Sequence, residues 1–85
     1  MFYVYILQSL VDNKRYIGHT SNIQKRLQRH NLGMVKSTKY RRPFKIVYSE
    51  PLDSKLEAVR REIKLKSLKG GDIIKKLISE YALRE

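Results

Sequence analysis

The chain has 85 residues, 41% of them hydrophobic, and its 19 lysines and arginines against eight acidic residues give a net charge of +11. One small domain fits this length, and the lack of cysteine excludes disulfides and thiolate zinc sites. No apolar run approaches the roughly 20 residues of a membrane span, so we expect neither a membrane segment nor a signal peptide. The lack of cysteine favours a reducing cytoplasm. The positive charge predicts an anionic partner. Nucleic acid comes before a membrane surface, because the apolar helix faces are needed for the core.

Residues 2–8, FYVYILQ, are mostly aromatic or β-branched and carry no charge, which is typical of a buried strand. Strand alternation places Tyr3, Tyr5 and Leu7 on one face and the residues between them on the other. The polar turn sequence DNK then leads into residues 15–17, which resume an extended pattern. We therefore predict an antiparallel hairpin.

A helix is predicted over residues 22–31, after the polar turn that follows Gly18. Ser21, with Gln24 three residues later, has the form of a capping box at the start of this helix. Gly33 is expected to end the helix in a left-handed conformation. A glycine at a strand end, here Gly18, predicts that backbone or substrate approaches the chain closely at this position.

Two pairs of residues, each four apart, divide this helix into faces. Ile23 and Leu27 form the apolar face, and Arg26 and His30 lie together beside it. Because the preceding strand carries Tyr16, we expect Tyr16, Arg26 and His30 to point into one space. This is the candidate catalytic site.

The segment 34–42 is polar and basic and has no periodicity, so we expect a mobile, positively charged surface loop. Cations interleaved with an aromatic ring are typical of a surface that grips phosphates and stacks a base, although a solvated loop fits the composition equally well. The candidate DNA-binding residues of this segment are Lys36, Lys39, Tyr40, Arg41 and Arg42.

A third strand is predicted after Pro43, and its alternation puts Phe44, Ile46 and Tyr48 on one face. Asp53 or Ser54 is expected to cap a second helix. The apolar stripe predicted for that helix is Leu56, Val59 and Ile63. The glycine pair at 70–71 is expected to end it. A third helix, beginning at Asp72, has an apolar face made of Ile73, Ile74, Leu77, Ile78 and Tyr81.

The predicted order of elements is therefore ββαβαα. Such a chain folds as an α+β domain, here a small three-stranded antiparallel sheet flanked by three helices. Since the sequence has no internal repeat, linker or second domain, residues 1–85 are expected to form a single domain.

Glu62 is a carboxylate on a helix that is otherwise basic outside its core stripe, and we place it at the rim of that stripe. From there it can enter a sheltered pocket as a metal ligand or form an ion pair with Lys66, four residues later. Mg²⁺ tolerates one protein carboxylate, because it keeps several waters and binds phosphate oxygens. The histidines His19 and His30 are too few for a zinc site unless Glu62 joins them.

Arg26 can bind two oxygens of a phosphate through its planar fork, although a surface arginine fits so basic a chain as well. Either Tyr16 or His30 could act as the base that activates a water. His30 has the more suitable ionisation range, and the spacing alone does not rank the two. A tyrosine simply packed on the sheet also fits the position of Tyr16.

These residues resemble the GIY-YIG nuclease family over essentially the whole chain. The resemblance is carried by Tyr3-Val4-Tyr5 in the first strand and by the spacing YIG-x-T-x5-R-x3-H, which runs from Tyr16 to His30. Glu62 falls on the helix where the family carries its metal-binding glutamate. Tyr3 stands where the family name has glycine, a substitution that small stand-alone members tolerate.

The resemblance implies an endonuclease that hydrolyses DNA phosphodiester bonds with one divalent ion, Mg²⁺ or Mn²⁺, held by Glu62. It selects Tyr16 over His30 as the base and gives Arg26 the role of offsetting the developing charge. Tyr5 would support the site, and His19 would lie behind it or face the DNA. The predicted catalytic set is Tyr5, Tyr16, Arg26, His30 and Glu62.

Larger family members attach separate recognition domains, and the sequence predicts none here. We therefore expect low sequence specificity, structure-directed cutting of nicked or branched DNA, or recruitment by another protein. A double-strand cut would require a homodimer or two successive events. The alternatives are a nucleic-acid-binding module with the same fold but no activity, and an interaction domain for an acidic protein.

Overall fold

Three antiparallel strands form the sheet on which the other elements pack. The computed structural model describes residues 1–68 and 71–84. Its strands are β1 (Phe2–Ser9), β2 (Arg15–Thr20) and β3 (Phe44–Leu52). β1 lies in the centre and pairs with both others, so the strand order is β2-β1-β3.

The helices follow the predicted order. They are α1 (Ile23–Asn31), α2 (Lys55–Ser67) and α3 (Asp72–Arg84), and a short 3₁₀ turn, η1 (Lys39–Arg41), precedes β3. The predicted α+β fold with the order ββαβαα is confirmed. Within the described residues, no helix is both long and apolar enough to cross a membrane.

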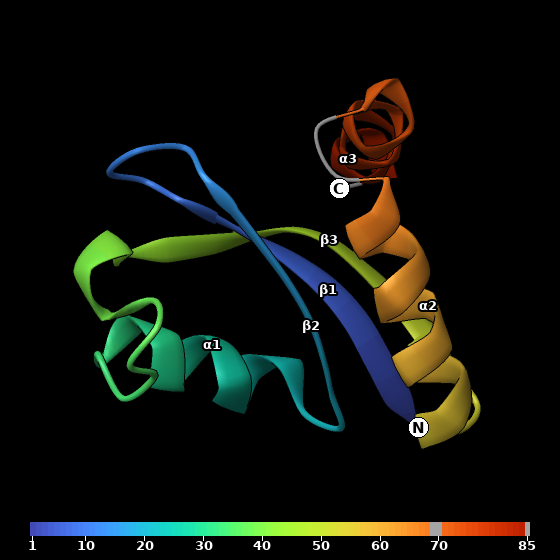
Figure 1. The fold of residues 1–85 in the computed structure, drawn as a ribbon, viewed down its shortest axis with the longest axis horizontal. Coiled ribbons are helices and arrows are strands. Elements are labelled where there is room, and N and C mark those ends of the chain that lie inside the picture. Colours follow the sequence, from blue (N-terminus) through green and yellow to red (C-terminus); the bar gives the residue numbers. More distant parts are fainter. Residues whose placement is uncertain (69–70, 85) are drawn as a thin grey trace.

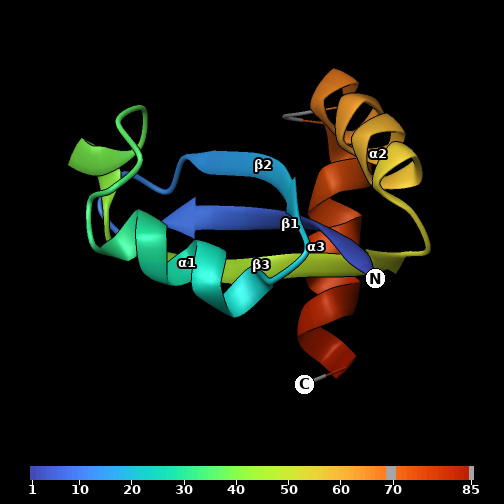
Figure 2. The ribbon, with the colours of Figure 1, turned by 90° about the horizontal axis from the view of Figure 1, so that it is seen from below.

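α1 and the pair α2–α3 cover opposite faces of the sheet, as Figure 1 and Figure 2 show. Tyr5 and Leu7 face α1, where Leu27 packs against them. Val4 and Ile6 face the other side and form a core with residues of α2 and α3. The predicted alternation in the first strand is thus confirmed, and β2 remains an edge strand.

The prediction that Phe44, Ile46 and Tyr48 share one face is wrong. Phe44 and Ile46 pack beside Tyr5, whereas Tyr48 belongs to the core on the α2–α3 side. The strand register shifts between Ile6 and Leu7, so that Tyr48 and Ile46 pair with consecutive residues of β1. The extra residue is a β-bulge, and one added residue reverses the alternation of the strand.

The apolar stripe predicted for α2 is also wrong. Leu56 and Ile63 are 59% and 63% exposed, whereas Ala58 and Leu65 are fully buried. The small side chain of Ala58 lets the helix backbone approach the sheet closely. Glu62 lies four residues after Ala58 and three before Leu65, so it belongs to the packed face and not to its rim.

The helix caps correct one prediction and confirm another. Asn22, and not Ser21, caps α1, because its side chain accepts a hydrogen bond from the backbone N–H of Lys25. Ser54 caps α2 in the same way by accepting from Glu57. Gly33 has the expected left-handed conformation, with φ of 76°.

α3 begins at Asp72 as predicted. Ile74 is buried and Leu77, Ile78 and Tyr81 pack against the core, but Ile73 is exposed. The predicted helix end at residues 70–71 falls partly on Gly70, which lies outside the described residues. α2 itself ends at Ser67.

The basic segment 34–42 is less irregular than predicted. It contains η1, and Thr38 within it is buried. Two hydrogen bonds anchor the segment: the Ser9 hydroxyl donates to the Arg41 carbonyl over 2.5 Å, and the Thr38 hydroxyl lies 2.8 Å from Nδ1 of His30. Long-range polar contacts of this kind leave no periodic signal in a sequence.

Candidate active site

Tyr5 and Arg26 form the centre of the candidate site on the α1 side of the sheet. Tyr5 is 1% exposed, and its hydroxyl accepts a hydrogen bond of 3.3 Å from Nε of Arg26. Burial raises the pKa of Tyr5, Arg26 opposes this rise, and the charges of Tyr16 and Glu62 add to it. Tyr5 is therefore a neutral phenol at pH 7 that holds the guanidinium of Arg26.

Gly18 lies opposite Tyr5 in the β1–β2 pair and makes room for its ring. A Cβ at residue 18 would lie 2.5 Å from the Tyr5 hydroxyl oxygen and 3.3 Å from Cε2 of Tyr16. The first of these distances is shorter than real Cβ contacts. A close approach at Gly18 was predicted for backbone or substrate, and here it is made by the Tyr5 side chain.

His30 is packed against Tyr16, with 4.9 Å between the ring centroids. It is fully buried, and its Nε2 has no hydrogen-bond partner among the described residues. Burial lowers the pKa of His30, and the positive charges of Arg26 and Arg29 lower it further. His30 is therefore a neutral ring inside the protein, joined to Thr38 through Nδ1.

Glu62 comes from α2, on the face of the sheet opposite to α1. Its side chain is 17% exposed, and both carboxylate oxygens are engaged. Nδ1 of His19 lies 2.6 Å from Oε1, and Nζ of Lys66 lies 2.7 Å from Oε2. Burial acts to raise the pKa of Glu62, but the hydrogen bonds from Lys66 and His19 outweigh it and lower the pKa. Glu62 is therefore ionised at neutral pH.

The edge strand β2 carries site residues on both faces of the sheet. Tyr16 packs on the α1 side, while His19, three residues later, turns to the α2 side and reaches Glu62. The charge of Glu62 contributes to the raised pKa of Tyr5. Lys66 has a pKa raised mainly by Glu62 and slightly by Tyr16. Tyr5 is hydrogen-bonded to Arg26 and its ring lies 6.4 Å from that of Tyr16, whereas Glu62 is bonded to Lys66, which lines the same hollow as Tyr16.

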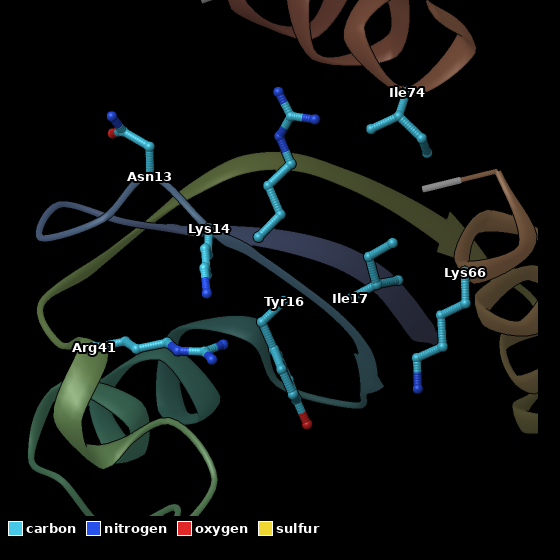
Figure 3. Close-up of a pocket in the computed structure, with 8 residues that line it drawn as sticks. Asn13, Lys14, Tyr16, Ile17, Arg41, Lys66 and Ile74 are labelled. Atoms are coloured by element: carbon cyan, nitrogen blue, oxygen red, sulfur yellow. The ribbon is translucent and has the colours of Figure 1, made fainter. Parts of the chain in front are cut away.

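A large open hollow of about 810 Å³, here called the β2 hollow, adjoins this edge. Its lining residues are Asn13, Lys14, Arg15, Tyr16, Ile17, Arg41, Lys66 and Ile74. Figure 3 shows Arg41 and Lys66 on either side of Tyr16, with Tyr16 and Lys66 extending in the same direction. Tyr16 therefore stands in the wall of a strongly cationic hollow.

The predicted DNA-binding residues are only partly brought together. Arg41 lines the β2 hollow, and His19 is bound to Glu62. The other four do not line it and are exposed on the surface: Lys36, Lys39, Tyr40 and Arg42. Nζ of Lys39 lies 5.7 Å from the ring centroid of Tyr40.

Several residues that shape the site were missed by sequence reasoning. Lys14 and Arg15 line the hollow, but the sequence pattern indicated only that they belong to a turn and a strand. Asn31 joins α1 to β3, since its side chain accepts from the Phe44 N–H over 2.7 Å and donates to the Phe44 carbonyl over 3.2 Å. Ser9 holds Arg41 across 32 residues of sequence. Such distant partners leave no local pattern to find.

Few side chains of the candidate site could bind a divalent ion in the described part of the chain. No group of three or more histidine and acidic side chains gathers in the described part of the chain. The adjacent side chains of Glu62 and His19 offer one oxygen and one nitrogen, and both side chains are partly exposed. Such a set fits an ion that keeps several waters and completes its shell with phosphate oxygens.

A family model described as the GIY-YIG catalytic domain matches residues 1–76. A UPF0213 protein of Staphylococcus haemolyticus is 47% identical, with 76% of this chain and 79% of the relative aligned. A UPF0213 protein of Clostridium perfringens is 41% identical, over 100% of this chain and 90% of its own length. Among solved structures, the solution NMR structure of UPF0213 protein BH0048 from Bacillus halodurans is similar, with a TM-score of 0.57 and 36% identity, covering 93% of this chain and 84% of that one.

Proposed function

The chain belongs to the GIY-YIG catalytic domain family, a nuclease family, and we propose that it is a metal-dependent endonuclease that hydrolyses phosphodiester bonds in DNA. One observation carries the proposal. Arg26 is hydrogen-bonded to Tyr5 on one side of β2, and Tyr16 shares the wall of the β2 hollow with Lys66, which holds the carboxylate of Glu62.

Arg26 acts on the scissile phosphate in this proposal. Its Nε is held by the Tyr5 hydroxyl, and the two terminal nitrogens of the fork are the groups that would bind phosphate oxygens. As the transition state forms, charge builds on those oxygens, and a guanidinium held in advance offsets it without reorganisation. Tyr5 is thus a positioning residue.

Tyr16 is the base, or the group that orients the attacking water. It is half-buried in the wall of the β2 hollow, where a water and a phosphate can reach it. As the base, Tyr16 would act as a phenolate that takes one proton from the attacking water and becomes the neutral phenol. The full burial of His30 and its bond to Thr38 argue against His30 as the base and favour a role in positioning Tyr16.

Glu62 would hold the divalent ion. When bound, Mg²⁺ or Mn²⁺ supplies a positive charge that polarises a phosphate oxygen. Glu62 is already ionised and is held on the packed face of α2, so its carboxylate needs no large movement to serve as a ligand.

The substrate strand would lie in the β2 hollow. Its four cations, Lys14, Arg15, Arg41 and Lys66, suit the phosphate backbone and offer no dedicated pattern for reading bases. We therefore propose low sequence specificity and preference for nicked or branched DNA, in which a strand can leave the duplex.

A binding module without activity is the second candidate. It is favoured by the hydrogen bonds that His19 and Lys66 make to both oxygens of Glu62, because they compete with a metal ion for the carboxylate. In that case the hollow would bind DNA and no strand would be cut.

The deciding experiment compares labelled nicked, flapped and four-way-junction DNA with Mg²⁺, Mn²⁺ or EDTA. Glu62→Ala and Arg26→Ala are each expected to lower kcat by about 100-fold or more while DNA binding is retained. Glu57→Gln and Arg29→Gln are matched controls, because both residues are exposed on the same two helices.

Cutting that persists in EDTA, or equally in Glu62→Ala, would contradict the proposal. DNA retention without cutting on every substrate would support the binding module. Retention of an acidic protein but not of DNA would support the interaction domain.

A further inference from the structure

We propose that His19 is a second protein ligand of the divalent ion, and that it makes the site prefer a first-row transition ion such as Mn²⁺ over Mg²⁺. The inference rests on the proposed function, in which Glu62 holds the ion. Nδ1 of His19 and Oε1 of Glu62 face each other across 2.6 Å, a spacing close to that of two neighbouring metal ligands.

The distance between the two donor atoms requires little change. Two adjacent ligands of an octahedral ion, each about 2.1 Å from it, lie about 3 Å apart. The His19–Glu62 pair therefore has to open by only about 0.4 Å for an ion to replace the shared proton. Both side chains are partly exposed, at 29% and 17%, so waters and a phosphate can complete the coordination shell.

Both ligands stand on regular elements and not on a free loop. His19 lies on β2, where it pairs with Val4 of the central strand. Glu62 lies between the buried residues Ala58 and Leu65 on α2. Their mutual distance is thus set by the packing of α2 on the sheet, which suits a preformed two-ligand site.

The chemistry of the pair explains the preference. Imidazole nitrogen binds first-row transition ions more readily than it binds Mg²⁺, which favours oxygen ligands and its own waters. In the hydrogen bond Nδ1–H donates to the ionised carboxylate. When an ion takes that place, the Nδ1 proton passes to water and the Nδ1 lone pair binds the ion.

Lys66 limits the site and couples it to substrate. It holds Oε2 of Glu62 at 2.7 Å, so the carboxylate offers the ion one oxygen. The amine also repels a cation, which weakens binding of the free ion. A phosphate between them offsets both charges, and for this reason the ion and DNA should bind together.

The test uses Mn²⁺ alone with the whole chain, followed by electron paramagnetic resonance. Pulsed measurements are expected to show a directly coordinated nitrogen in the wild type, and ¹⁵N-histidine labelling should change its coupling. In His19→Gln that signal should vanish, and Mn²⁺ affinity should fall about tenfold or more, while Mg²⁺ affinity measured by competition stays within about twofold.

The possible outcomes distinguish a failure of the His19 proposal from a failure of the proposed function. If Glu62→Gln abolishes Mn²⁺ binding but the wild type has no coordinated nitrogen, His19 is not a ligand and the Glu62 site stands. If Mn²⁺ binding is unchanged in Glu62→Gln, the metal site of the proposed function is itself wrong. A nitrogen signal that survives in His19→Gln would also overturn the inference. The wild-type spectrum needs no variant, so a misfolded mutant does not block the test.

Discussion

Gly18 and Tyr5 show how a single missing side chain arranges the candidate site. Because residue 18 has no Cβ, the Tyr5 ring can lie across β2 and place its hydroxyl against Arg26. Tyr5 is buried, so its ring has little freedom to move away from an added atom. Gly18 is needed because it leaves space beside β2, and the side chain of Tyr5 on the neighbouring strand fills that space.

Gly18→Ala should therefore lower stability and activity together. An added methyl 2.5 Å from the Tyr5 hydroxyl forces the ring aside, and overpacking of this kind costs about 1–3 kcal/mol. Urea unfolding measures the loss of stability, and cleavage of nicked DNA measures the loss of kcat.

The double variant Gly18→Ala, Tyr5→Phe serves as the control. Without the hydroxyl, part of the stability should return, but kcat should stay low because Arg26 has lost its acceptor. A Gly18→Ala protein with unchanged stability and cleavage would contradict this account of the packing.

Among the elements, α1 is held to the rest of the molecule by side chains near its C-terminal end. His30 is joined to Thr38 of the basic segment, and Asn31 is joined to the backbone of Phe44 in β3. These bonds fix the orientation of the helix that carries Arg26. They also connect α1 to the segment whose Arg41 lines the β2 hollow.

The buried His30 predicts how stability depends on pH. Its pKa in the fold lies below the ordinary 6.5, so between these two values the unfolded chain binds more protons than the folded one. The contribution to stability is thus fully present above pH 6.5 and is lost as the pH falls through the folded-state pKa. The slope for one proton is at most about 1.4 kcal/mol per pH unit.

Urea unfolding between pH 5 and pH 7.5 should show this slope, and His30→Gln should remove it. The carboxylate of Glu62, whose pKa is lowered below 4.5, contributes only at more acidic pH and so does not overlap. A wild-type stability that is level from pH 7.5 to pH 5 would show that His30 is not desolvated as described.

For the whole molecule, the distribution of charge matters more than its total. The net charge of +11 attracts any polyanion, but the β2 hollow gathers four cations beside Tyr16. Lys45, by comparison, is exposed on β3, the opposite edge of the sheet. A strand bound for cleavage should therefore depend on the first set and not on Lys45.

Lys14→Gln is expected to raise KM for nicked DNA and leave kcat unchanged. The slope of log K against log salt should become shallower by about 0.9, as for the loss of one phosphate contact. Lys45→Gln, which removes the same charge elsewhere, should change neither quantity appreciably. Equal effects of both variants on KM and slope would mean that binding follows the net charge alone.

The order of elements, the α+β class and the alternation of β1 could be read from the sequence, because they depend on local periodicity and turn residues. The spacing from Tyr16 to His30 likewise placed Arg26 and His30 on neighbouring turns of one helix. The net charge, and the expectation of an anionic partner, need no structure at all.

Only the tertiary structure decided where the packed face of α2 lies, which side Tyr48 faces and that His19 binds Glu62. The periodicity of α2 favoured Leu56 and Ile63 as the buried residues, but the helix packs on the sheet through the face that contains Ala58. This packing places Glu62 against His19. The bulge in β3 and the Tyr5 ring over Gly18 depend in the same way on partners in other strands. A sequence determines contacts among near neighbours, whereas contacts between distant residues are set by the packing of the whole chain.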